Sequence, residues 1–251
     1  MIRTALALLG VALVSSVALP AVASTDTPWL RRLIFFEELE DAFDGKAHAL
    51  RWDMTSWVGG DWQRIWLKSD GEAWSQASSA ADGVTAEVQL LYGRLIAPFW
   101  DLQIGLRGEL TDVALTDGAT VDMHKRVHLT VGVEGLAPYR FDLEPRIFIS
   151  QDGDLSARLR VAYALAITQR LMARPSAEIN AALQSVPAFS VGKGLNDLEA
   201  GLRLGYQILR EIEPYVGLSW SRAFGETARL LQTAGDTTRE TRGVAGLRAW
   251  F

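Results

Sequence analysis

The feature that most constrains the fold is a two-residue alternation that recurs along the chain. At residues 240–251, ETRGVAGLRAWF, one set of alternate residues is small or apolar, and the other set carries all the charged residues. Because the side chains of a strand point in turn to its two faces, a period of two predicts strands with one apolar and one polar face. The same alternation recurs in four further segments: 100–110, 139–150, 157–168 and 197–208.

These segments have the length of strands that cross a membrane. They are about ten residues or longer, whereas strands of soluble proteins are commonly five or six residues long, and a tilted strand needs about 9–11 residues to cross a bilayer. A soluble sandwich, in which the apolar face packs on a second sheet, is the alternative. We predict an all-β fold, an antiparallel transmembrane outer-membrane β-barrel of about twelve strands, since single-chain barrels of this kind have an even number.

The predicted strands are 32–43, 47–58, 62–73, 83–96, 99–112, 122–136, 138–150, 154–168, 170–183, 194–210, 213–224 and 240–251. Pro145 and Pro175 fall inside two of them. Because proline cannot donate to a strand ladder, we expect local bulges or register breaks there. The last strand should close the barrel against the first, so that no edge is left open.

The links between these strands alternate between tight and long. Tight links lie at 58–61, 97–98, 137–138, 169–170 and 210–213, and longer polar ones at 69–82, 112–121, 184–193 and 225–239. Outer-membrane barrels have short periplasmic turns and longer external loops, so we place the tight links in the periplasm. Aromatic residues near the tight links should form an interfacial belt: Trp57, Trp62, Phe99, Trp100, Tyr139, Tyr215, Trp250 and Phe251.

The first residues predict export. A basic start is followed by an apolar run from Ala5 to Leu19 and by the small-x-small motif Ala21–Ala23, the pattern of a secretory signal peptide. The run is too short for a membrane anchor. We therefore expect a signal peptide at 1–23, a short periplasmic N-terminal segment at 24–31, a transmembrane barrel at 32–251, and a location in the cell outer membrane of a Gram-negative bacterium.

Composition narrows the possible partners. The formal net charge is −5, which argues against a nucleic-acid partner. The chain has no cysteine, so disulfides and thiolate metal sites are excluded. The expected surroundings of the barrel are outer-membrane lipid.

Three longer blocks resemble a known family: WVGGDWQRIWLKSDGE at 57–72, LLYGRLIAPFWDLQIGLR at 90–107 and LNDLEAGLRLGYQILREIEPYVGLSWSRAFGETA at 195–228. With the final ETRGVAGLRAWF they are similar to the copper resistance protein B family over about residues 36–251. The resemblance implies an outer-membrane protein that binds or sequesters copper, or reduces the amount that enters, and that works with other periplasmic copper resistance proteins. Members often carry a Met- and His-rich N-terminal segment; here STDTPWLR, residues 24–31, has neither residue.

The best candidate copper ligands lie in one short segment, DMHKRVH. Copper(I) prefers thioether and copper(II) imidazole ligands, and the segment supplies Asp122, Met123, His124 and His128. The two histidines share a strand face but lie about 13 Å apart on a regular strand. They can therefore share an ion only if Asp122–His124 belongs to an external loop or neighbouring strands add ligands; otherwise they are a loop histidine and a lumen histidine bonded to charges.

The polar faces define a second candidate site, inside the barrel. A paired network of charges is the expected state, with a narrow polar channel as the functional alternative. His128 and Thr130 also share a face, as in some lipid hydrolases, but they should point away from lipid and no orienting acid is evident, so we expect no catalysis. The predicted lumen residues are Glu87, Gln89, Asp101, Gln103, Arg107, Glu109, Arg140, Asp142, Glu144, Arg146, Arg158, Arg160, Glu178, Glu199, Arg203 and Arg248.

Overall fold

Strands dominate the computed structural model, which describes residues 30–44, 47–76, 83–111 and 124–251. The predicted signal peptide lies outside these residues. One α-helix, α2 (Gly225–Ala234), and two 3₁₀ turns, Pro138–Arg140 and Pro187–Phe189, accompany the strands. The strands are β1 (Arg31–Phe43), β2 (Ala47–Gly59), β3 (Gln63–Gln76), β4 (Gly83–Ala97), β5 (Trp100–Thr111), β6 (His124–Ala137), β7 (Phe141–Ser150), β8 (Leu155–Tyr163), β9 (Leu165–Ala166), β10 (Leu171–Ala182), β11 (Gly194–Tyr206), β12 (Ile212–Ala223) and β13 (Arg239–Trp250).

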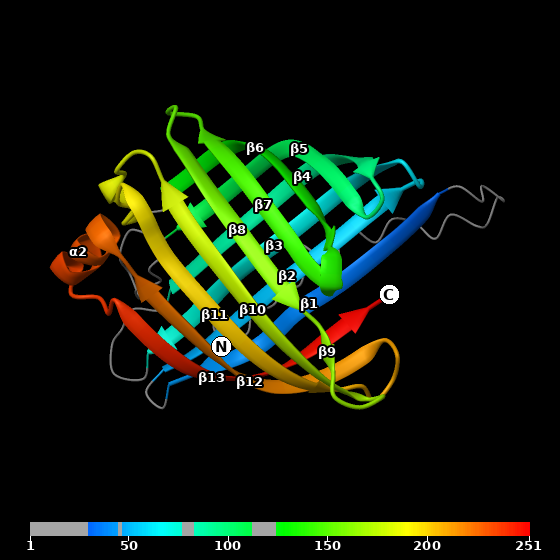
Figure 1. The fold of residues 1–251 in the computed structure, drawn as a ribbon. Coiled ribbons are helices and arrows are strands. Elements are labelled where there is room, and N and C mark those ends of the chain that lie inside the picture. The colour runs from blue at the N-terminus through cyan, green and yellow to red at the C-terminus, as the bar shows by residue number, and fades with distance from the viewer. Residues whose placement is uncertain (1–29, 45–46, 77–82, 112–123) are drawn as a thin grey trace, which may run out of the picture.

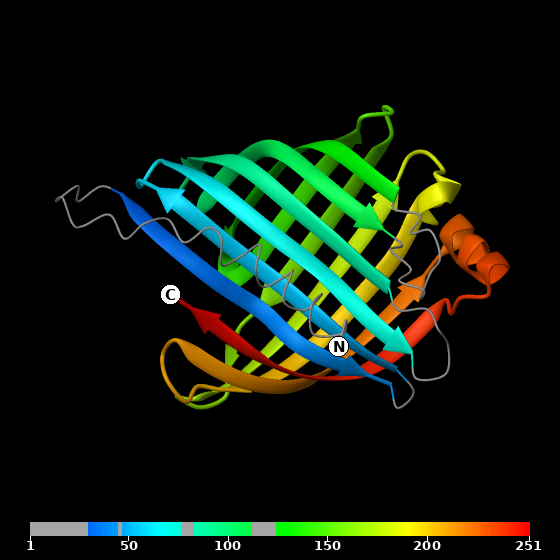
Figure 2. The same ribbon diagram turned by 180° about the vertical axis from the view of Figure 1, so that it is seen from behind.

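The strands form one closed antiparallel barrel (Figures 1 and 2). Each pairs with its neighbours in chain order, and β11 pairs with β10 as well as β12. Of the thirteen strand segments, β8 and β9 are two parts of one strand, because both pair with β10. The described residues therefore make twelve barrel strands, which confirms the predicted fold class and count.

The chain's last strand closes the barrel. β13 pairs with β1 from Phe35↔Trp250 to Phe43↔Gly243. The final residue extends this ladder, since Ile34 and Phe251 exchange both backbone hydrogen bonds, at 3.0 and 2.9 Å. Closure removes the unpaired strand edges, which a hydrocarbon environment does not tolerate.

The two-residue alternation separates an outer apolar face from an inner polar one. In β4, Val88 and Leu90 are 45% and 56% exposed on the outside, while Glu87 and Gln89 are 5% and 2% exposed on the inside. Within the described chain no helix is long and apolar enough to cross a membrane.

The two prolines interrupt pairing on one side without shifting the register. Pro145 pairs with Leu159 of β8, but the β6–β7 ladder skips it between Arg146 and Leu143. Pro175 pairs with Leu202 of β11, and the ladder on its other side is broken between β8 and β9. The missing N–H explains both gaps in the ladders, but the predicted bulges or register breaks are absent at the two prolines.

A bulge lies instead in β1, where no feature of the sequence predicts one. The register with β2 shifts between Phe36 and Glu38. A bulge adds one residue to a strand and re-aims the side chains beside it. As a result Glu37 and Glu38, although consecutive, both face the interior and line the same cavity.

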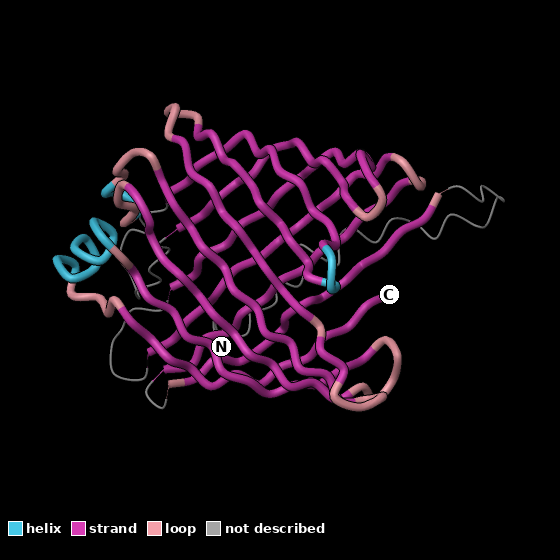
Figure 3. The backbone as a smooth tube through the Cα atoms, viewed as in Figure 1, coloured by secondary structure: helices cyan, strands magenta, loops and turns pink. Residues whose placement is uncertain are grey.

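The two described long links, 184–193 and 225–239, lie at one end of the barrel, the long-link end, and the predicted tight turns lie at the other (Figure 3). α2 stands at the long-link end, within the link predicted as polar loop. Gly235 ends this helix in the left-handed region, φ 86°, where its N–H bonds to Gln232 and the N–H of Asp236 bonds to Leu231. Which end faces the periplasm stays a prediction.

Several residues are placed differently from the prediction, among them Trp57, whose ring faces inward against Trp66 and the Arg64 guanidinium. Arg140 is exposed in the turn before β7, with φ 66°, and does not reach the lumen. Tyr215 is not part of an interfacial belt, because its ring is buried on the inner face and its hydroxyl bonds to Glu40. Four aromatic residues of the tight-turn end are strongly exposed as expected: Trp62, Phe99, Tyr139 and Phe251.

Candidate functional site: the charged lumen

The inner faces of β3 to β7 are filled by a compact polar layer centred on Arg146. This guanidinium is 2% exposed and donates to Glu134 at 3.3 Å and to Gln89 at 3.2 Å, with further bonds to Glu144 and Gln103. Buried charges are tolerated only when they are paired and their hydrogen-bonding groups are satisfied. This side of the lumen is therefore a structural network, as the alternation predicted.

One aromatic residue lies within this polar layer. Phe148 is 1% exposed on the inner face of β7, with the Arg107 guanidinium 4.3 Å and that of Arg158 5.4 Å from its ring centre. The negative face of an aromatic ring attracts such cations, most strongly where water is excluded. Phe148 therefore holds two cations together inside the barrel, and they share Glu87 as their carboxylate partner, at 2.6 and 3.0 Å.

His128 lies beside this ring. Its Nε2 is 3.9 Å from Glu109, while its buried Nδ1 has no hydrogen-bond partner. On the neighbouring strand it pairs directly with Arg107, whose positive charge disfavours a metal ion there. Thr130 is fully buried on the same inner face. His128 and Thr130 therefore both point away from lipid, as expected.

Beside this network lies a cavity of about 370 Å³, which Glu134 and Glu144 of the network also line. It is lined by twice as many acidic as basic side chains. The acidic residues are Glu37, Glu38, Asp53, Asp70, Glu72, Glu134, Asp142, Glu144, Glu178 and Glu199; the basic ones are Arg51, Lys68, Arg160, Arg203 and Arg248. With all of them ionised the lining carries an excess of negative charge, which favours cations.

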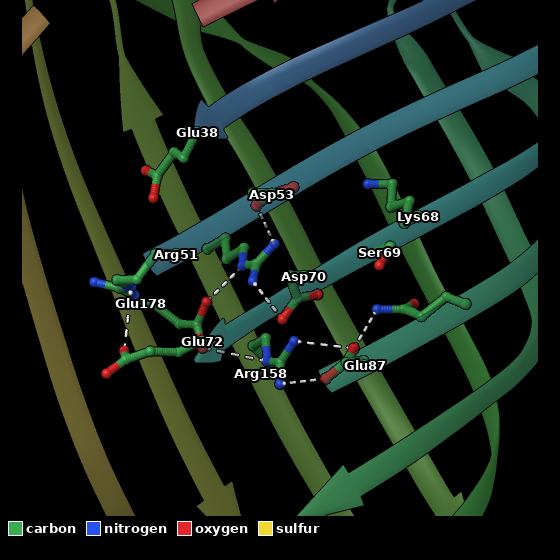
Figure 4. A network of polar contacts seen from close by, with 12 residues as sticks. Glu38, Arg51, Asp53, Lys68, Ser69, Asp70, Glu72, Glu87, Arg158 and Glu178 are labelled. Carbon is green, nitrogen blue, oxygen red and sulfur yellow. Dashed lines mark hydrogen bonds and ion pairs between the residues drawn. The ribbon is translucent and has the colours of Figure 1, made fainter. Parts of the chain in front are cut away.

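Several of these carboxylates share one cation. Arg160 reaches Glu178 at 2.5 Å, Asp53 at 3.2 Å and Asp70 at 3.8 Å (Figure 4). Lys68 is likewise divided between Glu134 at 2.6 Å and Glu144 at 3.1 Å. The basic side chains therefore neutralise only part of the negative charge that faces the cavity.

The predicted copper ligands are not brought into one described cluster. Asp122 and Met123 lie outside the described residues, His124 begins β6 with its side chain also outside them, and His128 faces the lumen four residues further on. Among the residues that the structure describes, no three or more His, Asp or Glu side chains are arranged to hold a metal ion.

At the long-link end α2 is fixed to the 184–193 link. The Glu226 carboxylate accepts hydrogen bonds from the Lys193 N–H at 3.0 Å and the Ser185 hydroxyl at 3.1 Å, and Thr227 accepts one from the Gly192 N–H at 2.9 Å. Because these donors favour the ionised carboxylate, they lower the pKa of Glu226 below its ordinary value.

The sequence prediction missed the acidic residues contributed by the first three strands. Glu37, Glu38, Asp53 and Asp70 line the cavity but were not among the predicted lumen residues. Asp53 and Asp70 lie directly opposite each other in the β2–β3 ladder. Strand parity could have identified these two and also Glu38, which shares the parity of the inward Glu40, whereas the inward position of Glu37 depends on the bulge in β1.

Comparisons with solved structures describe the same fold. The KdgM porin covers 88% of this chain and 99% of its own, with a TM-score of 0.51 and 11% identity. The NanC porin covers 87% and 98%, with a TM-score of 0.52 and 12% identity. Outer membrane phospholipase A from Escherichia coli covers 87% and 91%, with a TM-score of 0.51 and 12% identity. At such identities the likeness concerns the outer-membrane barrel fold alone.

Comparisons of sequence identify the family. Copper resistance protein B of Escherichia coli is 36% identical over 219 residues, 87% of this chain and 69% of that protein. The copper resistance protein B homolog of Pseudomonas syringae pv. tomato is 35% identical over 214 residues, 85% and 67% of the two chains. A model of the copper resistance protein B precursor family matches residues 31–251. This chain, a twelve-stranded barrel with an acid-rich lumen, therefore belongs to the copper resistance protein B family.

Proposed function

We propose that the protein serves copper resistance at the outer membrane by retaining copper ions in its acid-lined cavity and so slowing their passage into the cell. The observation that carries this proposal is the cavity of about 370 Å³, whose acidic side chains outnumber the basic ones two to one. No step of this role requires catalysis. Export by a signal peptide in a Gram-negative cell, and cooperation with periplasmic copper resistance proteins, belong to the same proposal.

The chemistry of the lining favours copper(II) over other divalent ions. For a given set of oxygen and nitrogen ligands, affinity among the first-row divalent metals is highest for copper. Since the described residues include no group of three or more metal ligands, retention rests on the excess negative charge and on single carboxylates. We therefore expect weak, exchangeable binding rather than a permanent copper centre.

The test is copper binding to the purified, folded barrel. Wild-type protein should bind copper(II) more tightly than zinc or magnesium, and the double variant Asp53→Asn/Asp70→Asn should bind less. Asp61→Asn is the matched control, since Asp61 is exposed and lies outside the cavity, paired with Arg31 at 3.5 Å. Equal copper binding by the wild type and the double variant would contradict retention in the cavity.

The role in the cell is tested separately. A deletion strain should be more sensitive to copper than the wild type and equally sensitive to zinc. Equal growth of the two strains across a copper series would contradict a role in copper tolerance, whatever the purified barrel binds.

A second place for copper is the segment from Asp122 to His128. We propose that Asp122, Met123 and His124 form an additional rim site that uses imidazole and thioether ligands. His128 belongs to it only if neighbouring strands bring further ligands. Copper stoichiometry of His124→Ala and His128→Ala measures each contribution, and unchanged stoichiometry in both variants counts against this segment.

A general channel for small solutes is the second candidate function, favoured by the presence of a cavity inside the barrel. A channel that does not discriminate among ions would give stable single-channel steps in a planar bilayer with little preference between copper and other cations. A silent bilayer would count against it.

A further inference from the structure

Two cavities meet at one arginine. The central cavity of about 370 Å³ and a smaller one of about 80 Å³ share three lining residues: Arg51, Glu72 and Glu199. The smaller cavity is otherwise lined by Ser219, Ser221, Glu240 and Arg242. Since Ser221 and Glu240 are paired near the long-link ends of β12 and β13, it extends from the central cavity toward that end of the barrel.

Arg51 separates the two spaces by a bond that crosses the lumen. Its guanidinium, on β2, donates to both carboxylate oxygens of Glu199 on β11, at 2.6 and 3.2 Å. Three strands stand between β2 and β11 in the barrel wall, so this contact joins facing walls rather than neighbouring strands. Figure 4 shows Arg51 extending into the lumen.

Further charges hold the arginine in place. Its Nε is 3.5 Å from Glu72, whose other oxygen accepts a hydrogen bond from Arg242 at 2.5 Å, and Arg242 also pairs with Glu240 at 2.7 Å. A bidentate arginine–carboxylate pair is geometrically specific. The contact therefore has a defined geometry that depends on a single guanidinium group.

Among the described residues, the inner face around Arg146 is closely packed. Arg146, Phe148 and Gln103 are each no more than 2% exposed there, and none of them lines either cavity. Arg51, in contrast, lines both cavities.

We propose that Arg51 is the gate of an ion path running through the central cavity and the smaller one. With Arg51 bonded to Glu199 the path is closed; with Arg51 displaced the two cavities join, and Glu72 and Glu199 face the path as negative charges that admit cations. This inference shares with the proposed function the premise that cations enter the lumen. It concerns the permeation of simple ions and not the retention of copper.

The experiment measures conductance of the purified barrel in planar bilayers under a potassium chloride gradient. Arg51→Ala should raise the single-channel conductance severalfold over the wild type and shift the reversal potential toward cation selectivity. Arg51→Lys, which keeps the charge but not the bidentate bond, should fall between the two.

Arg64→Ala is the matched control. Arg64 is also a partly buried inner arginine, 24% exposed against 21% for Arg51, and pairs with one acid, Asp101, at 2.9 Å. It lines neither cavity, so its removal should leave conductance at the wild-type level.

Folding of each variant is checked by the heat-modifiable gel shift. A folded Arg51→Ala barrel with wild-type conductance and selectivity overturns the gate, as does an equal rise in Arg64→Ala. If Arg51→Ala does not fold, the Glu199→Gln variant is measured instead, because it weakens the same bond from the other wall of the barrel. This variant should also raise the conductance, and no rise overturns the proposal. Copper tolerance of the deletion strain is independent of these outcomes, so failure of the gate and failure of the proposed function are distinguishable.

Discussion

Removal of the Glu40 carboxylate should destabilise the folded barrel strongly. Glu40 is 1% exposed and accepts two hydrogen bonds from Arg203, at 2.9 and 2.8 Å, and one from the Tyr215 hydroxyl at 2.9 Å. Breaking a buried ion pair by removing one partner costs about 3–5 kcal/mol. Arg203 keeps Glu38 as a partner at 2.8 Å, so we expect Glu40→Ala to lower the free energy of unfolding by about 3 kcal/mol, the lower end of that range.

The assay is equilibrium unfolding of the refolded barrel in detergent, followed by tryptophan fluorescence and by the heat-modifiable gel shift. Tyr215→Phe removes one of the three bonds, to a charged acceptor, and should cost about 1.5–3 kcal/mol. Arg31→Ala is the control, because the Arg31–Asp61 pair is 67% and 72% exposed and should contribute about 0–1 kcal/mol. If Glu40→Ala is no less stable than Arg31→Ala, the buried pair is not what ties β1 to β11 and β12.

Three further predictions concern other parts of the barrel. The hydrogen bonds to Glu226 lower its pKa, so its contact with Lys193 stabilises the α2 end fully above the ordinary carboxyl pKa of 4.5 and is lost as the pH falls through the lowered pKa. In the wild type, proteolysis of the 184–193 link should therefore increase only at acidic pH. In Glu226→Gln it should already be increased at neutral pH. Gly105→Ala places a Cβ 2.0 Å from the Leu90 carbonyl oxygen and should impair assembly, seen as loss of the heat-modifiable form. Phe148→Ala should lower the free energy of unfolding by about 3–5 kcal/mol, since it empties a fully buried position between two guanidinium groups; a smaller loss would mean the layer repacks.

Most of the fold could be predicted from the sequence because a barrel strand in a membrane has lipid on one face and the polar lumen on the other. This requires the two-residue alternation that the sequence shows. Each predicted strand corresponds to one barrel strand, and the polar face of β4 and β7 points inward as the alternation required. Where the prediction failed, local conformation overrode the pattern. Arg140 lies in a turn with positive φ, and α2, which Gly235 ends, forms in a link predicted as a polar loop.

The candidate site was predictable only in part. The sequence indicated that charges fill the lumen, and most of the inward residues were identified correctly. The predicted copper segment from Asp122 to His128 stays untested, since most of it lies outside the described residues. The cavity itself had no sequence signal, because its shape depends on which side chains meet across the barrel.

The lipid face, the lumen face and the strand count follow from the amino-acid sequence, since a period of two along each strand is enough to predict them. Which charges pair depends on how the closed barrel brings distant strands together. Arg51 meets Glu199 and Arg203 meets Glu40 over separations of 148 and 163 residues. Such partners are set by the tilt and stagger of the closed sheet, and the bulge in β1 changes which side chains point inward. No local sequence pattern encodes these distant partners or the bulge. The acidic cavity and the Arg51–Glu199 contact therefore exist only in the closed barrel.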